Sequence, residues 1–166
     1  YDSIEAVVWT GIPGTQGCIS LGKVLSGAIN PSGRLVDTYA YDVSSAPASE
    51  NFGNYKYDNM NGMAFINYEE GIYVGYRYYE TRYAGDEEGY RKAVQYPFGH
   101  GLSYTDFAWE TVNFAVENEM VNWEVEVTNT GDVAGKDVLQ LYFTAPYIPG
   151  GIEKSAIELA AYDKTE

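Results

Sequence analysis

The chain has 166 residues, of which 45% are hydrophobic and 16% aromatic, enough for one ordinary domain or two small ones with an apolar core. Its 24 acidic and 10 basic residues give a formal net charge of -14, which disfavours binding to nucleic acid and to anionic membrane surfaces. The one cysteine, Cys18, excludes an internal disulfide, cannot build a metal site by itself and is expected to be a small core residue.

Membrane and export segments are not apparent in the sequence. No apolar stretch approaches the roughly 18 residues that a membrane helix needs, and no basic-then-apolar leader precedes Tyr1. We therefore expect a soluble protein, cytoplasmic or secreted, without a metal or other cofactor. The start at Tyr1 and the C-terminal stretch AAYDKTE, which lacks a closing element, lead us to expect a piece of a longer protein.

Residues 5–27 are predicted to form a strand, a glycine-rich loop and a helix. The stretch EAVVWT (5–10) joins β-branched and aromatic residues without helical spacing, which is typical of a short buried strand. Glycines at positions 11, 14 and 17 end it. Cys18, Leu21 and Leu25 are then spaced three and four residues apart, as on one face of a short helix, and Gly27 is placed to cap it.

The order of strand, glycine loop and helix is also the order of a dinucleotide- or phosphate-binding loop. The spacing here, G-x-x-G-x-x-G, differs from the G-x-G-x-x-G pattern, and Pro13 lacks one of the backbone N–H groups that would bind a phosphate. No Lys-Ser/Thr pair follows to make a P-loop. A structural turn is therefore the preferred interpretation.

Turns, a long loop and one strand are predicted between residues 30 and 89. NPSGR (30–34) has the composition of a turn, and residues 37–67 lack periodicity, as in a long ordered loop. IYVGYRYY (72–79) alternates with a period of two, which predicts a strand with aromatic side chains on both faces. AGDEEG (84–89) is predicted to be an acidic exposed turn.

From Phe107 onward the sequence predicts β-structure. VNWEVEVTN (121–129) places its apolar side chains on one face and its polar ones on the other, as in a half-buried antiparallel strand. TGDVAG turns the chain, and DVLQLYFTA supplies a second strand with Leu139, Leu141 and Phe143 on its inner face. Because a seven-stranded sandwich takes about 100 residues and only about 60 remain, the sandwich is expected to be incomplete.

Five stretches together resemble a known family: GIPGTQG, LSGAINPSGRL, YEEGIYVGYRYY, YPFGHGLSYTDF and VEVTNTGDVAGKDVLQLY. In this order they are similar to the C-terminal half of glycoside hydrolase family 3, the β-glucosidases and β-xylosidases. The resemblance implies a large exo-acting retaining enzyme with a (β/α)8-like barrel, an α/β sandwich domain and a fibronectin type III-like domain. The GIPGTQG stretch then looks like the glycine turn after a late strand of the α/β domain.

The fold class implied is the end of an α/β sandwich domain followed by an incomplete fibronectin type III-like β-sandwich. Residues 1–105 would be the C-terminal part of the α/β domain, residues 106–166 the N-terminal part of the fibronectin-like domain, and FGHGLSYT the hinge between them. The implied partners are the barrel domain of the same polypeptide and, through the whole enzyme, an oligosaccharide or glycoside substrate.

No catalytic residue is expected within the chain. Retaining hydrolysis needs two carboxyl groups about 5 Å apart, one as nucleophile and one as acid/base. In the family the nucleophile is an Asp of the barrel, and the acid/base Glu usually lies upstream of the segment that matches Tyr1. Neither can be transferred to a position in this sequence, so the chain alone is expected to be inactive and to support the site structurally.

The carboxylates and the histidine that are present have structural interpretations beside the functional ones. Glu70 matches the acid of the family's Tyr-x-Glu-Gly block, and it either lines a sugar site or pairs with Arg77. If Glu69 and Glu70 lie on a strand, they point to opposite faces and cannot act on one atom. The acids at 86–88 are expected to be solvated. His100, the only histidine, is expected to pack between its glycines rather than to join a Ser-His-Asp triad.

The chain has 17 tyrosines, and core packing is expected to account for most of them. Tyr68, beside the Glu70 block, is the one we expect to line a sugar site, so Tyr68 and Glu70 are the predicted substrate-binding residues. The rival interpretation is a non-catalytic carbohydrate-binding or adhesion module. The strand, loop and helix at 5–27 disfavour it, because such modules are usually all β. Self-association through an unpaired strand edge is also expected.

Overall fold

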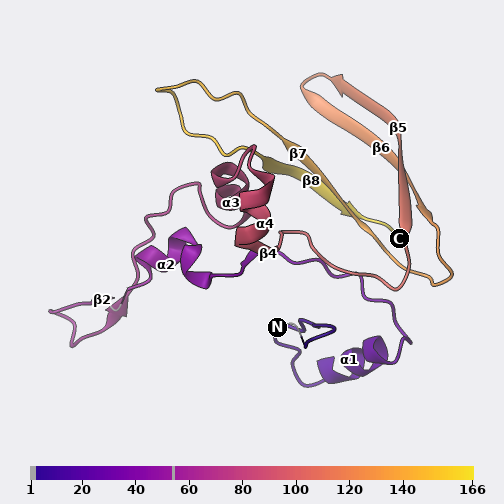
Figure 1. Ribbon diagram of the computed structural model, residues 1–166, viewed down its shortest axis with the longest axis horizontal. Helices are drawn as coiled ribbons and strands as arrows, with labels where there is room; N and C mark the ends of the chain where they lie inside the picture. Colours follow the sequence, from indigo (N-terminus) through magenta and orange to yellow (C-terminus); the bar gives the residue numbers. More distant parts are fainter. Residues whose placement is uncertain (1–2, 54) are drawn as a thin grey trace. The chain divides into compact units, whose positions relative to one another are not determined.

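The computed structural model describes residues 3–53 and 55–166 (Figure 1). Tyr1 and Asp2, the first residues of the domain predicted over 1–105, lie outside the described residues. The chain divides into two compact units that alternate along the sequence: a first unit of Tyr1–Ser32 with Leu102–Asp137, and a second unit of Gly33–Gly101 with Val138–Glu166. The predicted division at residues 105 and 106 stays a prediction.

The elements are short helices and two-stranded sheets. The helices are α1 (Gly17–Leu25), the 3-10 turn η1 (Val43–Ser45), α2 (Pro47–Asn51), α3 (Tyr76–Arg82) and α4 (Glu87–Ala93). The strands are β1 (Tyr39–Ala40), β2 (Tyr55–Lys56), β3 (Ala64–Phe65), β4 (Val94–Tyr96), β5 (Phe107–Glu117), β6 (Met120–Asn129), β7 (Val138–Phe143) and β8 (Glu158–Lys164). Within the described residues the strands pair β1–β4, β2–β3, β5–β6 and β7–β8, all antiparallel.

In the first unit the predicted helix and its cap are confirmed. α1 begins at Gly17 and ends at Leu25, and Gly27, at φ 75°, donates its N–H to the carbonyl of Val24 (2.9 Å). The strand predicted over residues 5–10 is wrong for this chain, because no described strand lies beside these residues to pair with them. Cys18, predicted to be a core residue, is exposed, since nothing in the described chain covers that face of α1.

β5 and β6 form the long hairpin of the first unit (Figure 1). Apolar residues face one another in the register, with Trp109 opposite Val127 and Phe114 opposite Trp123, so the predicted half-buried strand at 121–129 is confirmed. A register shift between Thr111 and Asn113 interrupts β5. The two-residue hairpin turn, Asn118 and Glu119, has φ of 51° and 63°, a conformation typical of the tight turns that match strand twist.

Asn30 joins three segments of the first unit. Its Oδ1 accepts hydrogen bonds from the Tyr104 N–H (2.8 Å) and the Ser103 hydroxyl (3.1 Å), and its Nδ2 donates to the Ala134 carbonyl (3.1 Å). The turn predicted for residues 30–34 is wrong, since the structure has no turn at these residues. The asparagine that we assigned to that turn instead connects the end of the α1 segment to the segments that precede β5 and follow β6.

The centre of the second unit is the pair of helices α3 and α4 (Figure 1). The strand predicted over 72–79 is wrong: Gly71 and Gly75, at φ 61° and 54°, redirect the chain, and α3 begins directly after Gly75. Tyr76 and Tyr79 then lie one helical turn apart, and Tyr79 is buried, with its hydroxyl 3.0 Å from Ser45 Oγ. Because nearly every position of this stretch is aromatic or apolar, the sequence pattern fits a helix as well as a strand.

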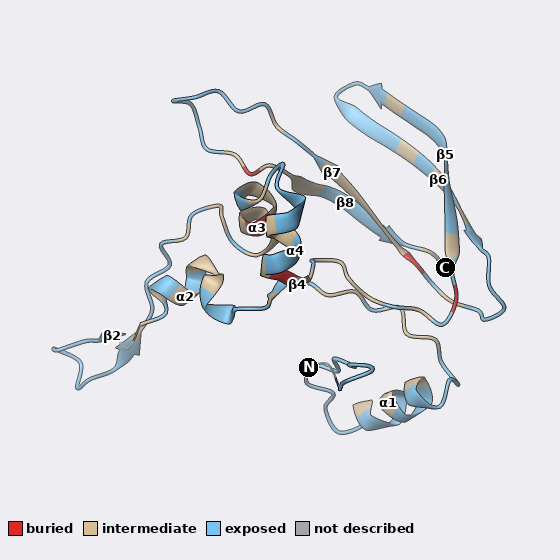
Figure 2. Cartoon of the chain, viewed as in Figure 1, coloured by how far each residue is buried: buried red, intermediate tan, exposed pale blue. Residues whose placement is uncertain are grey.

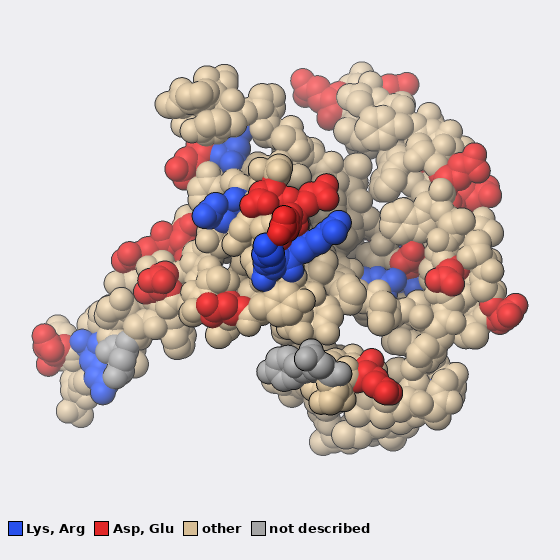
Figure 3. All heavy atoms as spheres, in the orientation of Figure 1, with Lys and Arg blue, Asp and Glu red and all other residues tan. Residues whose placement is uncertain are grey.

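The acidic stretch at 84–89 is partly a turn and partly the start of α4. Asp86 caps the helix by accepting the Gly89 N–H (2.9 Å). Glu87 and Glu88 are solvated as predicted, and their carboxylates lie next to Arg91 (3.6 Å) and Lys92 (2.6 Å) one turn later. Figure 3 shows acidic and basic atoms side by side over the middle of the drawn face.

The long loop predicted over 37–67 contains β1, η1, α2, β2 and β3, all of five residues or fewer. The strand predicted around Leu139 is confirmed as β7, with Leu139 and Leu141 half-buried but Phe143 exposed. Its partner is β8, which we did not predict from the sequence, because ELAAYDK lacks clear alternation of apolar and polar residues. The opposite face of β7 packs within the unit, where the Tyr142 ring lies 6.0 Å from Tyr76.

Few described residues are buried (Figure 2). They are Tyr79, Val94, Thr105, Asp137 and Ser155. Many large apolar side chains are exposed, among them Trp9, Ile12 and Trp109. In the described part of the chain, no helix combines the length and the apolar character needed to cross a bilayer.

Candidate functional site

The two predicted substrate-binding residues lie in the second unit, between β3 and α3. The Tyr68 side chain is 90% exposed and Glu70 is half-buried, both in backbone without regular structure. Among the described residues Glu70 has no ion pair, and Arg77 instead lies over the Tyr76 ring, 5.9 Å from its centroid. The Glu70–Arg77 ion pair that we considered is therefore not formed in the described residues, while a role in sugar binding stays a prediction.

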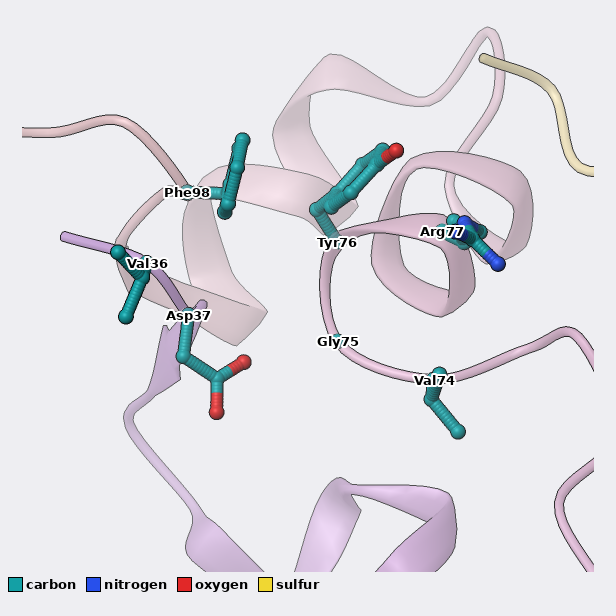
Figure 4. Close-up of a pocket in the computed structure, with 7 residues that line it drawn as sticks. All are labelled: Val36, Asp37, Val74, Gly75, Tyr76, Arg77 and Phe98. Atoms are coloured by element: carbon teal, nitrogen blue, oxygen red, sulfur yellow. The ribbon is translucent and has the colours of Figure 1, made fainter. Parts of the chain in front are cut away.

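A depression of about 350 Å³ opens beside the start of α3 (Figure 4). Its lining residues are Val36, Asp37, Val74, Gly75, Tyr76, Arg77 and Phe98. The Asp37 carboxylate points towards the Gly75 backbone, and its Oδ1 would lie 3.2 Å from a Cβ atom at position 75. Glycine at this position therefore provides both the positive φ and the close approach of Asp37.

Tyr76 forms the aromatic wall of the depression and is fixed from several sides. Its ring lies 4.7 Å from that of Phe98, and its hydroxyl accepts the Leu159 N–H (2.9 Å) from β8. One turn further along α3, the Thr81 hydroxyl accepts the Ala156 N–H (2.8 Å). β8 and the residues just before it thus hold α3 in place, and Tyr76 is anchored both at its ring and at its hydroxyl.

The chemistry available in the depression is limited. Asp37 supplies its one carboxylate, which already accepts the Thr38 N–H (2.8 Å), and Figure 4 shows the Arg77 side chain pointing away from Asp37. A carboxylate beside aromatic rings can accept hydrogen bonds from hydroxyl groups. It cannot perform retaining hydrolysis, which needs a second carboxyl group about 5 Å away.

The sequence did not single out Asp37, Tyr76 or Phe98. Gly75 directly before a tyrosine-rich stretch was the available signal for a special backbone position. The residues that meet there come from three segments far apart in the sequence. Their meeting depends on the packing of α3 against β7 and β8, and β8 was not predicted.

The tyrosines around α3 and α4 are neutral packing groups. Burial raises the pKa of Tyr90 far above the usual value of a phenol, and the hydrogen bond that its hydroxyl donates to Glu80 (2.7 Å) acts in the same direction. Burial, with Tyr76 and Glu80 nearby, also raises the pKa of Tyr142. These side chains therefore keep their protons at neutral pH and act as hydrogen-bond donors.

His100 packs as expected. Its ring stacks on Tyr96 at 5.0 Å, and its backbone carbonyl accepts the Leu35 N–H (2.8 Å). No serine or carboxylate side chain is hydrogen-bonded to it among the described residues, so a triad is not assembled there. The described part of the chain also contains no cluster of three or more His, Cys, Asp or Glu side chains that could hold a metal ion.

Residues 1–76 match the glycosyl hydrolase family 3 C-terminal domain. The chain is 36% identical to β-glucosidase A of Butyrivibrio fibrisolvens over 99% of its own length and 20% of that protein. Among solved structures it is similar to β-glucosidase 3B from Thermotoga neapolitana in complex with α-D-glucose, with a TM-score of 0.70, 36% identity, and coverage of 91% of this chain and 19% of that one.

A β-glucosidase from Paenibacillus barengoltzii gives a TM-score of 0.73 at 40% identity, and the match covers 90% of this chain and 15% of that one. The chain thus spans about a fifth or less of the length of the relatives that it matches. Both of its units lie within regions of similarity, since the match to the Butyrivibrio protein covers nearly every residue. The chain belongs to glycoside hydrolase family 3, with the family's C-terminal domain in residues 1–76.

Proposed function

We propose that the chain is a segment of a retaining, exo-acting β-glycosidase that hydrolyses terminal β-linked sugars, with β-glucosides as the preferred substrates. The observation that carries this proposal is the similarity of almost the whole chain to proteins named β-glucosidases, at 36% to 40% identity. Complexes of related structures with glucose support a glucoside substrate over a xyloside. The activity belongs to the whole polypeptide, of which this chain is a small part.

Within that enzyme the chain has a structural and site-supporting role. The arrangement of its carboxylates supports this, because Asp37 is the one carboxylate among the residues that line the depression beside α3. Tyr68 and Glu70 are its candidate contacts with substrate. Tyr68 is exposed and Glu70 is half-buried in this chain, so both side chains are accessible to a ligand held by another part of the enzyme.

The domain assignment is part of the same proposal. Residues 1–105 close an α/β sandwich domain, and residues 106–166 begin a fibronectin type III-like domain with β5, β6, β7 and β8 as its strands. Antiparallel pairing of all four strands and the apolar face of the β5–β6 hairpin support a sandwich half. The rival function, a carbohydrate-binding or adhesion module, gains no specific support, because the related proteins along the whole chain are enzymes.

The test is to express the full-length reading frame around this segment and to assay it with 4-nitrophenyl β-D-glucoside and β-D-xyloside. We expect turnover of both, faster with the glucoside. The stereochemistry of the first product, followed by NMR, should show retention of the anomeric configuration. Absence of turnover with every β-glycoside, from a protein that is folded by circular dichroism, would contradict the proposed function.

A further inference from the structure

The hairpin of β2 and β3 has one aromatic face and one polar face. Tyr55 pairs with Phe65 across the hairpin, and Tyr57 donates its N–H to the Met63 carbonyl (3.0 Å). Because side chains alternate along a strand and paired residues share a face, these four side chains lie on one face and Lys56 lies on the other. The aromatic face of the hairpin is thus formed by Tyr55, Tyr57, Met63 and Phe65.

The rings of the aromatic face support one another. The Phe65 ring lies 5.6 Å from the Tyr55 ring and 4.4 Å from the Tyr57 ring, at interplanar angles of 28° and 33°. Gly53 lies against the Tyr55 ring, because a Cβ atom at position 53 would be 2.5 Å from Tyr55 Cε2. A ligand that binds here therefore meets rings that are already positioned, which lowers the entropy cost of binding.

The aromatic face is accessible from outside the hairpin. Tyr55, Tyr57 and Met63 are 40%, 42% and 56% exposed, and Phe65 is half-buried. Figure 2 shows the hairpin largely as exposed. A short two-stranded hairpin is marginally stable by itself, and exposed aromatic side chains gathered on one face of it indicate a binding surface rather than a core.

The chemistry of the aromatic face fits an uncharged sugar. The face contains no acidic or basic side chain. β-Linked glucose units have C–H groups on the faces of their rings and hydroxyl groups around the edges, so an aromatic ring can cover the face while polar groups bind the hydroxyls. The tyrosine hydroxyls belong to the aromatic face, and the exposed carboxamides of Asn59 and Asn61 lie in the turn that joins the two strands.

We infer that the Tyr57 ring, supported by Phe65, stacks on a sugar in the leaving group of a β-linked gluco-oligosaccharide. Tyr68 and Glu70, the candidate contacts with substrate, follow β3 closely in the same segment of chain. The inference rests on the proposed function, because an exo-acting enzyme holds the terminal sugar at its two carboxyl groups and every further sugar then extends on the leaving-group side.

The charge of the chain favours a sugar over a second copy of the chain on this face. Two copies would each bring a net charge of -14 to the contact, whereas an oligosaccharide is neutral. Related β-glucosidase structures are complexes with glucose, the sugar unit that this inference places on the rings.

Steady-state kinetics of the full-length protein test the inference with cellotriose, laminaritriose and methyl β-D-glucoside, whose leaving group is too small to stack. Tyr57→Ala should lower kcat/KM for the better trisaccharide about three- to tenfold, mainly through KM, and leave the value for methyl β-D-glucoside unchanged. Tyr57→Phe keeps the ring and should retain most of the original value. Tyr162→Ala, the same change at a 74% exposed position of β8, is the control and should alter neither value. An equal loss with all three substrates in Tyr57→Ala would overturn the inference, because the hairpin would then only support the fold.

Titration calorimetry with sulfur-linked analogues of the two trisaccharides, which resist hydrolysis, measures the same contact without turnover. The Kd of the tighter analogue should rise about three- to tenfold in full-length Tyr57→Ala, while the Kd of glucose should stay unchanged. An unchanged Kd for the analogue together with a lower melting temperature would show that the aromatic face packs against another part of the polypeptide. An unchanged Kd together with a lower dimer fraction in sedimentation would identify a second copy as the partner. Either result would overturn the inference.

The outcomes also separate this inference from the proposed function. Weaker binding of the analogue by Tyr57→Ala, in a full-length protein that hydrolyses no glycoside, would support a sugar-binding face and contradict the function. Unchanged binding in an active full-length enzyme would do the opposite.

Discussion

At the scale of single residues, Asn30 has the clearest structural role. Its carboxamide accepts hydrogen bonds from the adjacent residues Ser103 and Tyr104 and donates one to Ala134, which joins its own segment to two others of the first unit. We expect Asn30→Ala to lower the free energy of unfolding by about 1–3 kcal/mol, because a main-chain N–H and a carbonyl lose their partner together. Asn122→Ala on the exposed face of β6 is the control and should change stability little. Urea denaturation of the two variants gives the comparison, and equal effects would show that the Asn30 network contributes nothing.

Gly75 and Gly22 should respond to alanine with opposite signs. Gly75 has φ 54° and a carboxylate oxygen 3.2 Å from the site of a Cβ atom, so Gly75→Ala should cost about 1–3 kcal/mol of stability. Gly22 lies inside α1 with no atom within 4 Å of its Cβ site, so Gly22→Ala should gain about 0.4–1 kcal/mol. Thermal unfolding measures both. A neutral Gly75→Ala would mean that the backbone before α3 relaxes without cost.

Only part of the candidate site could be predicted from single residues of the sequence. Glu70 and Tyr68 stood out because they belong to a motif that resembles a family. Asp37 belongs to no such motif, Phe98 was singled out only as part of the stretch FGHGLSYT, and their meeting with Tyr76 is a product of tertiary packing. Composition also indicated which roles were impossible, since one histidine and one cysteine leave few catalytic or metal-binding arrangements.

At the scale of elements, the predictions were confirmed where the spacing of apolar residues fitted either a strand or a helix, but not both. β6 alternates cleanly, and α1 has apolar residues at helical spacing, and both formed as predicted. The stretch 72–79 is aromatic on all sides, so its period could not distinguish strand from helix, and two glycines at positive φ decided for the helix. The segment 5–10 has the composition of a strand but no described neighbour, and a strand needs a partner.

The α3–α4 pair should lose stability in alkali. Tyrosines in the unfolded chain ionise near pH 10, whereas burial raises the pKa of Tyr90 and Tyr142 in the folded chain. Above about pH 10 the unfolded state therefore binds fewer protons than the folded state, and stability falls as the pH rises. Tyr90→Phe should reduce this fall between pH 9 and pH 11, roughly the range around the tyrosine value.

The measurement is chemical denaturation of both proteins across that pH range. Tyr162→Phe, at an exposed position of β8, is the control and should keep the slope of the original chain. Tyr90→Phe should also lower stability at neutral pH, because Glu80 loses the hydrogen bond from the phenol. If stability falls with pH equally steeply in all three proteins, groups other than Tyr90 cause the loss of stability in alkali.

At the scale of the whole molecule, the apolar face of the β5–β6 hairpin should make the isolated chain associate. Trp109, Phe114 and Val116 are 52%, 57% and 65% exposed on this face, and a lone hairpin offers two unpaired edges. Sedimentation should show dimers or larger species whose fraction rises with concentration. Phe114→Ser should reduce it, whereas Ala115→Ser on the opposite face should not. A clean monomer over a wide concentration range would contradict this expectation.

The last prediction concerns the activity of the chain in isolation and of Glu70 in the whole enzyme. Two carboxyl groups must converge on one glycosidic bond, and the described residues bring no such pair together at the depression beside α3. Exposed acids such as Glu87 cannot substitute, because its carboxylate lies beside Arg91 (3.6 Å) on the solvated surface of α4 and outside the depression. The 166-residue chain should therefore hydrolyse neither 4-nitrophenyl β-D-glucoside nor the xyloside.

In the full-length protein Glu70→Gln should change kcat/KM by less than about tenfold, mostly through KM, as expected of a substrate contact rather than a catalytic group. Turnover by the isolated chain that Glu70→Gln abolishes would make Glu70 catalytic and reverse this assignment.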